Sequence, residues 1–267
     1  FCHLYLIIEE TMKAIGVFGY HHTGKTTLAT KLITSLKEKG YQVAAIKDIH
    51  NENYRSDKEG SNSWRLAQAG ANPVFAKGLY DTALIFNSAL NFPEMLHFLN
   101  ADWLVIEGFR EAALPKIICA ENLNQIEELF DPTVIAITGE ISHSLQSYKD
   151  IPIIDYKTDF DKILSLVLLK TFDILPQSDP ECCSACGTTC YQMAIDILQG
   201  KAKREDCVLD SKNSIIISIG GKPLTIVPFV QNLFRDTILA MVSNLKGVDS
   251  AQEIEIKIKN RDERPLQ

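Results

Sequence analysis

The chain has 267 residues, of which 46% are hydrophobic and 23% are charged, and its formal net charge is −7. This composition is typical of a globular protein with a core, and the acidic balance argues against broad nucleic-acid binding. No apolar run approaches the ~18 residues of a membrane span. The segment before Met12 lacks the basic start and cleavage site of a signal peptide,. We therefore expect a cytoplasmic protein with no membrane association, whose native start is Met12.

Short apolar runs alternate with helical patterns over the first two thirds of the chain. The expected strands are residues 13–18, 42–46, 72–77, 82–86, 103–107, 116–120 and 133–138,. The expected helices are residues 25–39, 61–69, 93–99, 122–129 and 160–171,. Short, almost wholly apolar strands separated by helices are typical of a parallel sheet. The prediction is an α/β fold with a mostly parallel sheet and helices on both faces.

The composition changes after this region. The segment LPQSDPE, Leu175–Glu181, holds two prolines among polar residues and predicts a linker,. Beyond a cysteine-rich stretch and a helix near 191–198, two β-rich runs flank Gly220-Gly221, which indicates a tight hairpin,. A helix over 229–245 and a half-exposed strand over Glu253–Lys259 complete a small α+β domain,. The predicted parts are a nucleotide-binding domain at 12–172, a linker at 173–181, a cysteine-rich module at 182–209 and a ββαβ domain at 210–260.

The stretch GYHHTGKTT, Gly19–Thr27, has the spacing G-x-x-x-x-G-K-T of a Walker A loop,. Such a loop follows a buried strand and opens a helix, so that backbone amides and the helix N-terminus bind phosphates. Both flanking elements are predicted here. We expect Lys25 to reach the β- and γ-phosphates and Thr26 to ligate Mg²⁺. His22 and Thr23, like the other residues between the two glycines, would contact phosphate through their amides, so the adjacent histidines do not predict a metal site.

A phosphate loop of this kind works with an acidic residue at the end of a neighbouring strand. In DWLVIEGF, Glu107 ends an apolar run and is followed by Gly108, where backbone can approach a ligand. We expect Lys25 and Glu107 to be the catalytic residues, with Thr26 and Glu107 holding Mg²⁺. Asp48 and Asp57 are alternative candidates for sensing the terminal phosphate, and the residues do not decide between them. They also do not decide between GTP and ATP.

Four segments, GYHHTGKTTL, AIKDIHN, DKEGSNSWRLAQAGA and DWLVIEGFREAALPKI, follow in this order. Together they resemble the molybdopterin-guanine dinucleotide biosynthesis protein B family over about residues 12–171. The resemblance implies a P-loop, GTP-binding adaptor with weak GTPase activity. The residues that it assigns to the phosphates and Mg²⁺ are Gly19, Gly24, Lys25, Thr26 and Thr27. It assigns Asp57, Gly60 and Ser63 to the loop before the second helix, with Asp57 as a further cofactor-binding residue, and Glu107 and Gly108 to the acidic strand end.

The same resemblance implies partners. The family assists the guanylyltransferase that joins GMP to molybdopterin in the molybdenum or tungsten cofactor, and its members commonly form homodimers. A molybdenum or tungsten enzyme that receives the cofactor is a further expected partner. One departure from the family is the loop after Lys47, where relatives carry more histidines and this chain has only His50.

A second feature is the pattern Cys183-x₂-Cys186-x₃-Cys190-x₁₆-Cys207. Four thiolates in so short a segment can close around a 4Fe–4S cluster or a single tetrahedral metal. The segment resembles a small 4Fe–4S-binding domain of corrinoid and electron-transfer proteins, although its middle gap is one residue shorter and Cys182 is an alternative ligand. A 4Fe–4S cluster is the favoured interpretation, and the alternatives are a structural zinc site and free or disulfide-bonded thiols.

The first functional hypothesis is therefore a GTP-binding accessory protein of molybdenum-cofactor assembly with an iron–sulfur module. One alternative is a P-loop ligase or kinase that acts on a small acid with substantial turnover. The other is an electron-transfer protein gated by nucleotide binding.

Overall fold

The computed structural model describes residues 12–177, 186–207, 217–219, 222–224 and 228–243, together with residues 245, 254 and 256. The chain divides into two compact units, Phe1–Lys212 and Asn213–Gln267. No helix in the described part of the chain combines the length and the apolar character that crossing a membrane requires.

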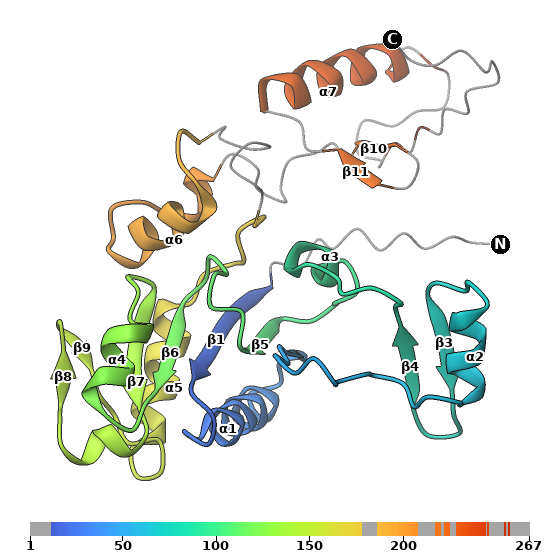
Figure 1. Ribbon diagram of the computed structural model, residues 1–267. Coiled ribbons are helices and arrows are strands. Elements are labelled where there is room, and N and C mark those ends of the chain that lie inside the picture. The colour runs from blue at the N-terminus through green and yellow to red at the C-terminus, as the bar shows by residue number, and fades with distance from the viewer. Residues whose placement is uncertain are drawn as a thin grey trace. The chain divides into compact units, whose positions relative to one another are not determined.

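The first unit is built on a five-stranded parallel sheet in the order β2-β5-β1-β6-β7. Figure 1 labels four of these strands, β5, β1, β6 and β7, which follow one another across the sheet. Its strands are β1 (Lys13–Gly19), β2 (Val43–Lys47), β5 (Trp103–Glu107), β6 (Lys116–Cys119) and β7 (Val134–Thr138). Each strand was predicted to within about two residues, and β5 coincides with its predicted range. The strands are almost completely buried apart from β2, which lies at an edge of the sheet. The predicted α/β fold is confirmed.

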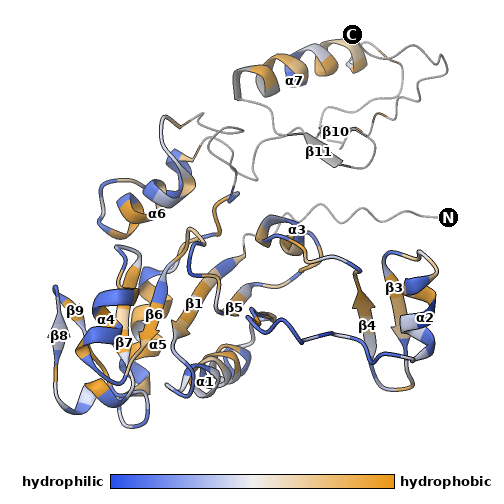
Figure 2. Cartoon of the chain, in the orientation of Figure 1, coloured by the Kyte–Doolittle hydropathy of each residue, from blue (hydrophilic) through white to orange (hydrophobic). Residues whose placement is uncertain are grey.

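Helices cover both faces of this sheet because side chains alternate along each strand. On one face, Ile15 and Val17 of β1 pack in a cluster with Leu28 and Leu32 of α1 and with Ile163 of α5. On the other face, separate clusters join the sheet to α3 and to α4. Figure 2 shows the hydrophobic character of β1, β6 and β7 beside the hydrophilic residues of α4. The helices are α1 (Lys25–Glu38), α3 (Phe92–Leu96), α4 (Leu123–Leu129) and α5 (Phe160–Lys170).

One group of elements differs from the prediction. The runs expected as strands at 72–77 and 82–86 form β3 (Val74–Lys77) and β4 (Thr82–Ile85), which pair antiparallel as a hairpin separate from the five-stranded sheet. Only four residues connect them, and a parallel pair needs a crossover of about a dozen residues or more,. The helix α2 (Asn62–Gln68) packs on the hairpin around the small cluster of Ala67, Val74 and Ile85.

Short elements that the sequence did not reveal follow β7. These are the 3₁₀ turn η1 (Glu140–His143) and the two-residue strands β8 (Ser147–Tyr148) and β9 (Ile151–Pro152), which pair antiparallel. They lead the chain back to α5.

Directly after α5, the chain packs against the sheet domain of the same unit. Leu175 is fully buried, and the side chain of Gln177 exchanges hydrogen bonds with the backbone of Ala113 at 2.8 and 3.1 Å. The beginning of the predicted linker therefore lies on the sheet domain, and residues 178–185 lie outside the described part. Helix α6 (Cys190–Leu198) and the turn η2 (Arg204–Asp206) follow.

In the second unit, β10 (Ile217–Ile219) and β11 (Lys222–Leu224) pair antiparallel, and α7 spans Pro228–Val242. The paired strands agree with the predicted hairpin, whose two glycines lie outside the described residues. The predicted strand at 253–259 also lies outside them, except for Ile254 and Ile256, which have no regular secondary structure.

Candidate functional site

The predicted phosphate loop connects the end of β1 to the start of α1. Gly24 is the N-cap of α1 and has φ of 92°, in the left-handed region that glycine tolerates best,. Gly19 has φ of 153°, and a Cβ on it would lie 2.2 Å from the carbonyl oxygen of Cys119. Both positions therefore require glycine, one for its backbone angles and one mainly for a close approach to β6.

The start of α1 has the features of an anion site. No side chain caps this helix, so the amides of its first turn are left for another acceptor,. The helix has 14 residues, and its dipole favours negative charge at this end,. Within the loop, the Thr23 hydroxyl donates to the carbonyl of Tyr20 at 2.9 Å, and the Lys25 ammonium donates to the same carbonyl. The neighbouring His21 and His22 are exposed.

The strand order brings the predicted Mg²⁺ ligands together. Because β5 lies beside β1, Glu107 reaches the first turn of α1, where the Thr26 hydroxyl donates to its carboxylate at 2.8 Å. A hydroxyl and a carboxylate are hard oxygen donors, which suit Mg²⁺. The Glu107 side chain is 13% exposed, so it is held firmly but remains open to a ligand.

Lys47 is a residue of this site that the sequence analysis missed. It ends β2, directly opposite Glu107 in the register of the parallel pair, and its Nζ lies 3.0 Å from Glu107 Oε1. The signal in the sequence was only a lysine at the end of an expected strand. Nothing local indicated that β2 pairs with β5.

The two candidate phosphate sensors, Asp48 and Asp57, have different surroundings. The Asp48 amide donates to the carbonyl of Glu107 at 2.8 Å, and the Asp48 carboxylate accepts from the Phe109 amide at 3.4 Å. Gly108 lies so close that a Cβ on it would be 2.5 Å from Asp48 Cβ. Asp48 therefore lies directly beside the Glu107–Gly108 strand end.

Asp57 has a different environment. Its carboxylate accepts hydrogen bonds from the Ser61 hydroxyl and the Lys58 amide in the turn before α2. Hydrogen bonds from Ser63 and Ser61 lower the pKa of Asp57. Among the described residues, these contacts tie Asp57 to its own turn rather than to the phosphate loop. Its predicted role stays a prediction.

Three of the predicted cluster ligands are described. Cys186, Cys190 and Cys207 belong to one hydrophobic cluster with Met193 and Phe172, and Cys207 is almost fully buried. Cys183 and the alternative ligand Cys182 lie outside the described residues. Within the part of the chain that the structure describes, no three His, Cys, Asp or Glu side chains are grouped as metal ligands.

Helix α6 of this module is joined to the sheet by a buried polar cluster at the starts of β6 and β7. The Lys116 ammonium lies 3.1 Å from the Asp131 carboxylate and 5.2 Å from the ring centre of Tyr191, which follows Cys190 on α6. Burial lowers the pKa of Lys116, and the charge of Asp131 opposes that shift. Burial, with a smaller contribution from Asp131, raises the pKa of Tyr191 to about 12.

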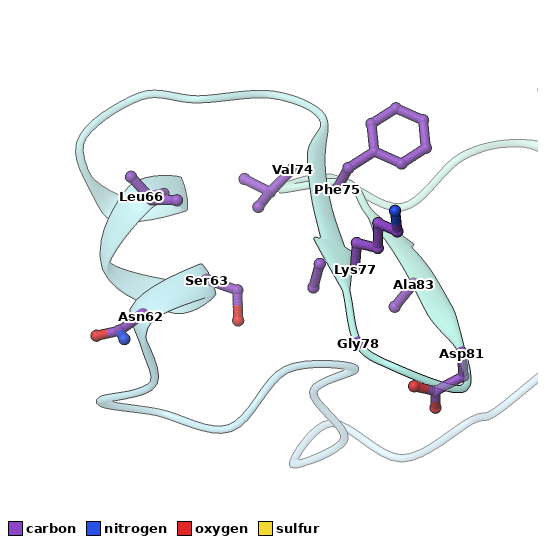
Figure 3. A pocket seen from close by; sticks show the side chains of 10 residues that line it. Asn62, Ser63, Leu66, Val74, Phe75, Lys77, Gly78, Asp81 and Ala83 are labelled. Atoms are coloured by element: carbon purple, nitrogen blue, oxygen red, sulfur yellow. The ribbon is translucent and has the colours of Figure 1, made fainter.

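A pocket lies elsewhere, between α2 and the β3–β4 hairpin (Figure 3). Its lining includes Leu66, Phe75, Lys77 and Asp81, and it includes no residue of the phosphate loop. Leu79 and Tyr80 at the tip of the same hairpin are almost completely exposed. The pocket is therefore separate from the candidate nucleotide site.

The chain is similar to several known proteins. Residues 14–140 match the family model described as "Molybdopterin guanine dinucleotide synthesis protein B". A protein of Methanocaldococcus jannaschii, described as a putative molybdopterin-guanine dinucleotide biosynthesis adapter protein, is 30% identical over 254 residues. That match covers 92% of this chain and 97% of the relative, so it continues beyond the sheet domain.

Two further proteins match a smaller part of the chain. The adapter protein of the same description from Haemophilus influenzae is 30% identical over 160 residues, covering 55% of this chain and 88% of the relative. The crystal structure of Bacillus subtilis MobB superposes with a TM-score of 0.51 at 25% identity, covering 59% of this chain and 96% of that one. The fold of the sheet domain is thus shared with a solved P-loop NTPase-like protein.

Proposed function

The chain belongs to the molybdopterin guanine dinucleotide synthesis protein B family, and from this premise we propose that it is a GTP-binding adapter in the synthesis of that dinucleotide. The observation that carries the proposal is the contact between Thr26 and Glu107 beside an uncapped helix N-terminus. A Mg²⁺-nucleotide requires an anion site with hard oxygen donors beside it, and here the donors are Thr26 in the first turn of α1 and Glu107 at the end of β5,.

In this proposal, each residue of the site has a part in binding the Mg²⁺-nucleotide. The amides from Gly19 to Thr27 cradle the phosphates, with Gly24 allowing the turn into α1. Lys25 now donates to the Tyr20 carbonyl, and its flexible stem lets it turn to the β- and γ-phosphates,. Thr26 and Glu107 hold Mg²⁺, which neutralises phosphate charge when bound. Asp48, at the end of β2 beside Gly108, is the better-placed phosphate sensor because it contacts both residues of the β5 strand end.

The adapter role implies slow hydrolysis and a protein partner. The descriptions of the relatives from M. jannaschii and H. influenzae support an adapter, and the partner of our proposal is the guanylyltransferase that transfers GMP to molybdopterin. We expect this chain to act as a homodimer, and light scattering coupled to gel filtration measures its mass. Steady hydrolysis above ~1 s⁻¹ without a partner, which lies in the range of ordinary enzymes, would instead favour a ligase or kinase.

Calorimetric titration with GTP and with ATP tests the nucleotide site. Lys25→Ala should weaken GTP binding on the order of 100-fold, because charge-assisted hydrogen bonds to phosphate are lost. Lys37→Ala is the matched control. Lys37 is exposed in the last turn of α1, so this substitution removes the same charge at the end of the helix far from the loop. Equal GTP affinity in the two variants would refute the assignment, and tighter ATP binding would refute the choice of GTP.

We further propose that Cys183, Cys186, Cys190 and Cys207 hold a 4Fe–4S cluster. The support is that three of these thiols belong to one hydrophobic cluster around α6, a setting that shields a cluster from water,. Cys190→Ser should lower the iron and sulfide content of protein purified without oxygen. Cys119→Ala is the control, because Cys119 is a buried thiol outside the motif whose pKa burial raises to about 12. If the protein instead contains one zinc ion per chain and no sulfide, the four thiols hold a structural zinc site and not a cluster.

A further inference from the structure

The Lys47 ammonium contacts both groups that we assign to Mg²⁺, the Glu107 carboxylate and the Thr26 hydroxyl. Its Nζ lies 3.0 Å from Glu107 Oε1 and 3.4 Å from the Thr26 hydroxyl. Those two groups are also hydrogen-bonded to each other at 2.8 Å. One positive charge of this chain therefore lies against the hydroxyl–carboxylate pair that a metal ion would use.

The position of Lys47 follows from the backbone. Lys47 and Glu107 are register partners at the ends of β2 and β5, so their side chains start from neighbouring points on the same edge of the sheet. The freedom of the two side chains differs. The Lys47 side chain is 54% exposed, whereas that of Glu107 is only 13% exposed. The carboxylate is thus the fixed member of the pair and the ammonium is the one that can move.

We propose that Lys47 is the counter-cation of the Mg²⁺ site, which competes with the free metal for Glu107 and transfers to the phosphates when the Mg²⁺-nucleotide binds. This inference rests on the proposed function. Two cations cannot share one carboxylate without strong repulsion, so binding of Mg²⁺ at Glu107 displaces the ammonium. The four-carbon stem of lysine lets the ammonium move away from Glu107, and phosphates bound at the start of α1 offer it a new negative partner.

Two measurable consequences follow. In the absence of nucleotide, Lys47 lowers the affinity of the site for a divalent metal. In the absence of metal, Lys47 supplies positive charge to the phosphates and so raises the affinity for nucleotide. Lys47 therefore couples the binding of the metal to the binding of the nucleotide, so that the two ligands bind together.

The experiment compares Lys47→Met with Lys37→Met in the full-length protein. Methionine keeps most of the stem and removes the charge in both, and Lys37 lies at the opposite end of α1 from the phosphate loop. We expect Lys47→Met to bind Mn²⁺ without nucleotide about three- to fivefold more tightly than the wild type, measured by electron paramagnetic resonance. In EDTA, we expect its GTP affinity to fall roughly tenfold, measured by calorimetry. The control should match the wild type in both titrations.

A double-mutant cycle tests whether the effect acts through Glu107. Without the carboxylate, in Glu107→Gln, the added Lys47→Met change should leave Mn²⁺ binding unaltered. If Lys47→Met and Lys37→Met give the same Mn²⁺ affinity, the inference is overturned, while GTP binding by the wild type still supports the proposed function. If the wild type binds no nucleotide with or without Mg²⁺, the proposed function fails and this inference fails with it.

Discussion

Two lysine–carboxylate pairs lie on the same parallel sheet at almost the same separation, 3.0 Å for Lys47–Glu107 and 3.1 Å for Lys116–Asp131. Their surroundings are different. The Lys47 side chain is 54% exposed at the end of β2, where the phosphate loop lies. The Lys116 side chain is 1% exposed at the start of β6, where it meets Asp131 and faces Tyr191 of α6. The two pairs have almost equal lengths and differ in burial, so we expect the exposed pair to open and the buried pair to stay fixed.

The buried pair is part of a connection between the sheet and the cysteine-rich module. Lys116 also donates to the carbonyl of Arg110, so its charge is satisfied by the pair, a backbone oxygen and an aromatic face. The Arg204 side chain donates to the carbonyls of Asp173 and Ile174 at 2.7 and 3.0 Å and adds a second link. In the exposed pair, Lys47 is open to solvent, and the pair lies beside the proposed ligand site.

The largest expected effect is on the buried pair. Lys116→Ala leaves the Asp131 carboxylate without its partner and should lower the free energy of unfolding by about 3 kcal/mol. Urea unfolding followed by circular dichroism measures the loss. The double variant Lys116→Met/Asp131→Asn removes both charges and should recover part of the stability. If the double variant is no more stable than Lys116→Ala, the cost is one of packing and not of an unpaired charge.

The next effect concerns the loop beside the exposed pair. Gly19→Ala places a Cβ 2.2 Å from the Cys119 carbonyl oxygen at φ of 153°, which should lower stability by about 2 kcal/mol. The displaced loop should also lose GTP affinity. Gly40→Ala is the control, because Gly40 also has a positive φ but no atom lies within 4 Å of its added Cβ. Thermal unfolding measures the stability of the two variants, and calorimetry measures their GTP affinity. Equal GTP affinity in both would contradict the close approach of Gly19 to β6.

A smaller effect should appear at alkaline pH. The pKa of Tyr191 is raised to about 12, whereas an unfolded tyrosine ionises near pH ~10. Between these values the folded chain holds a proton that the unfolded chain has lost, so stability falls as pH rises through this window. Tyr191→Phe has no such group, and its stability should decline less between pH ~10 and ~12. Urea unfolding at several pH values in this window measures the free energy of unfolding of both proteins. If that free energy falls equally with pH in the wild type and in Tyr191→Phe, Tyr191 is not shielded on α6.

The smallest expected effect is the stability change of Lys47→Met. An exposed ion pair contributes about 0.5 kcal/mol or less, because water screens it and the lysine stem loses entropy when it is held. The variant should therefore unfold at nearly the wild-type urea concentration while its metal and nucleotide binding change. A loss comparable to that of Lys116→Ala would mean that both pairs are structural.

The elements were predictable where the pattern is local. The range 103–107 was predicted as a strand because it is a short and mostly apolar run. The observed strand β5 has the same bounds. The Walker A spacing of two glycines, a lysine and a threonine predicted a loop between a strand and a helix, and this segment does connect β1 to α1. Its binding of phosphate stays a prediction. Such signals need no knowledge of distant contacts, since backbone preferences and side-chain periodicity act over a few residues.

The order of the strands and the pairing of side chains across them were decided by the tertiary structure. The sequence placed 72–77 and 82–86 among the strands but did not show that they form a separate hairpin. It did not show that β5 lies between β1 and β2, and this position alone brings Lys47 and Asp48 to Glu107 and Glu107 to Thr26. The amino-acid sequence by itself determined most strands and helices of the sheet domain and the loop that joins β1 to α1, because these depend on neighbouring residues. Which charges meet was determined only by packing, because the residues that form each pair are far apart in the chain and become neighbours only when the strands align.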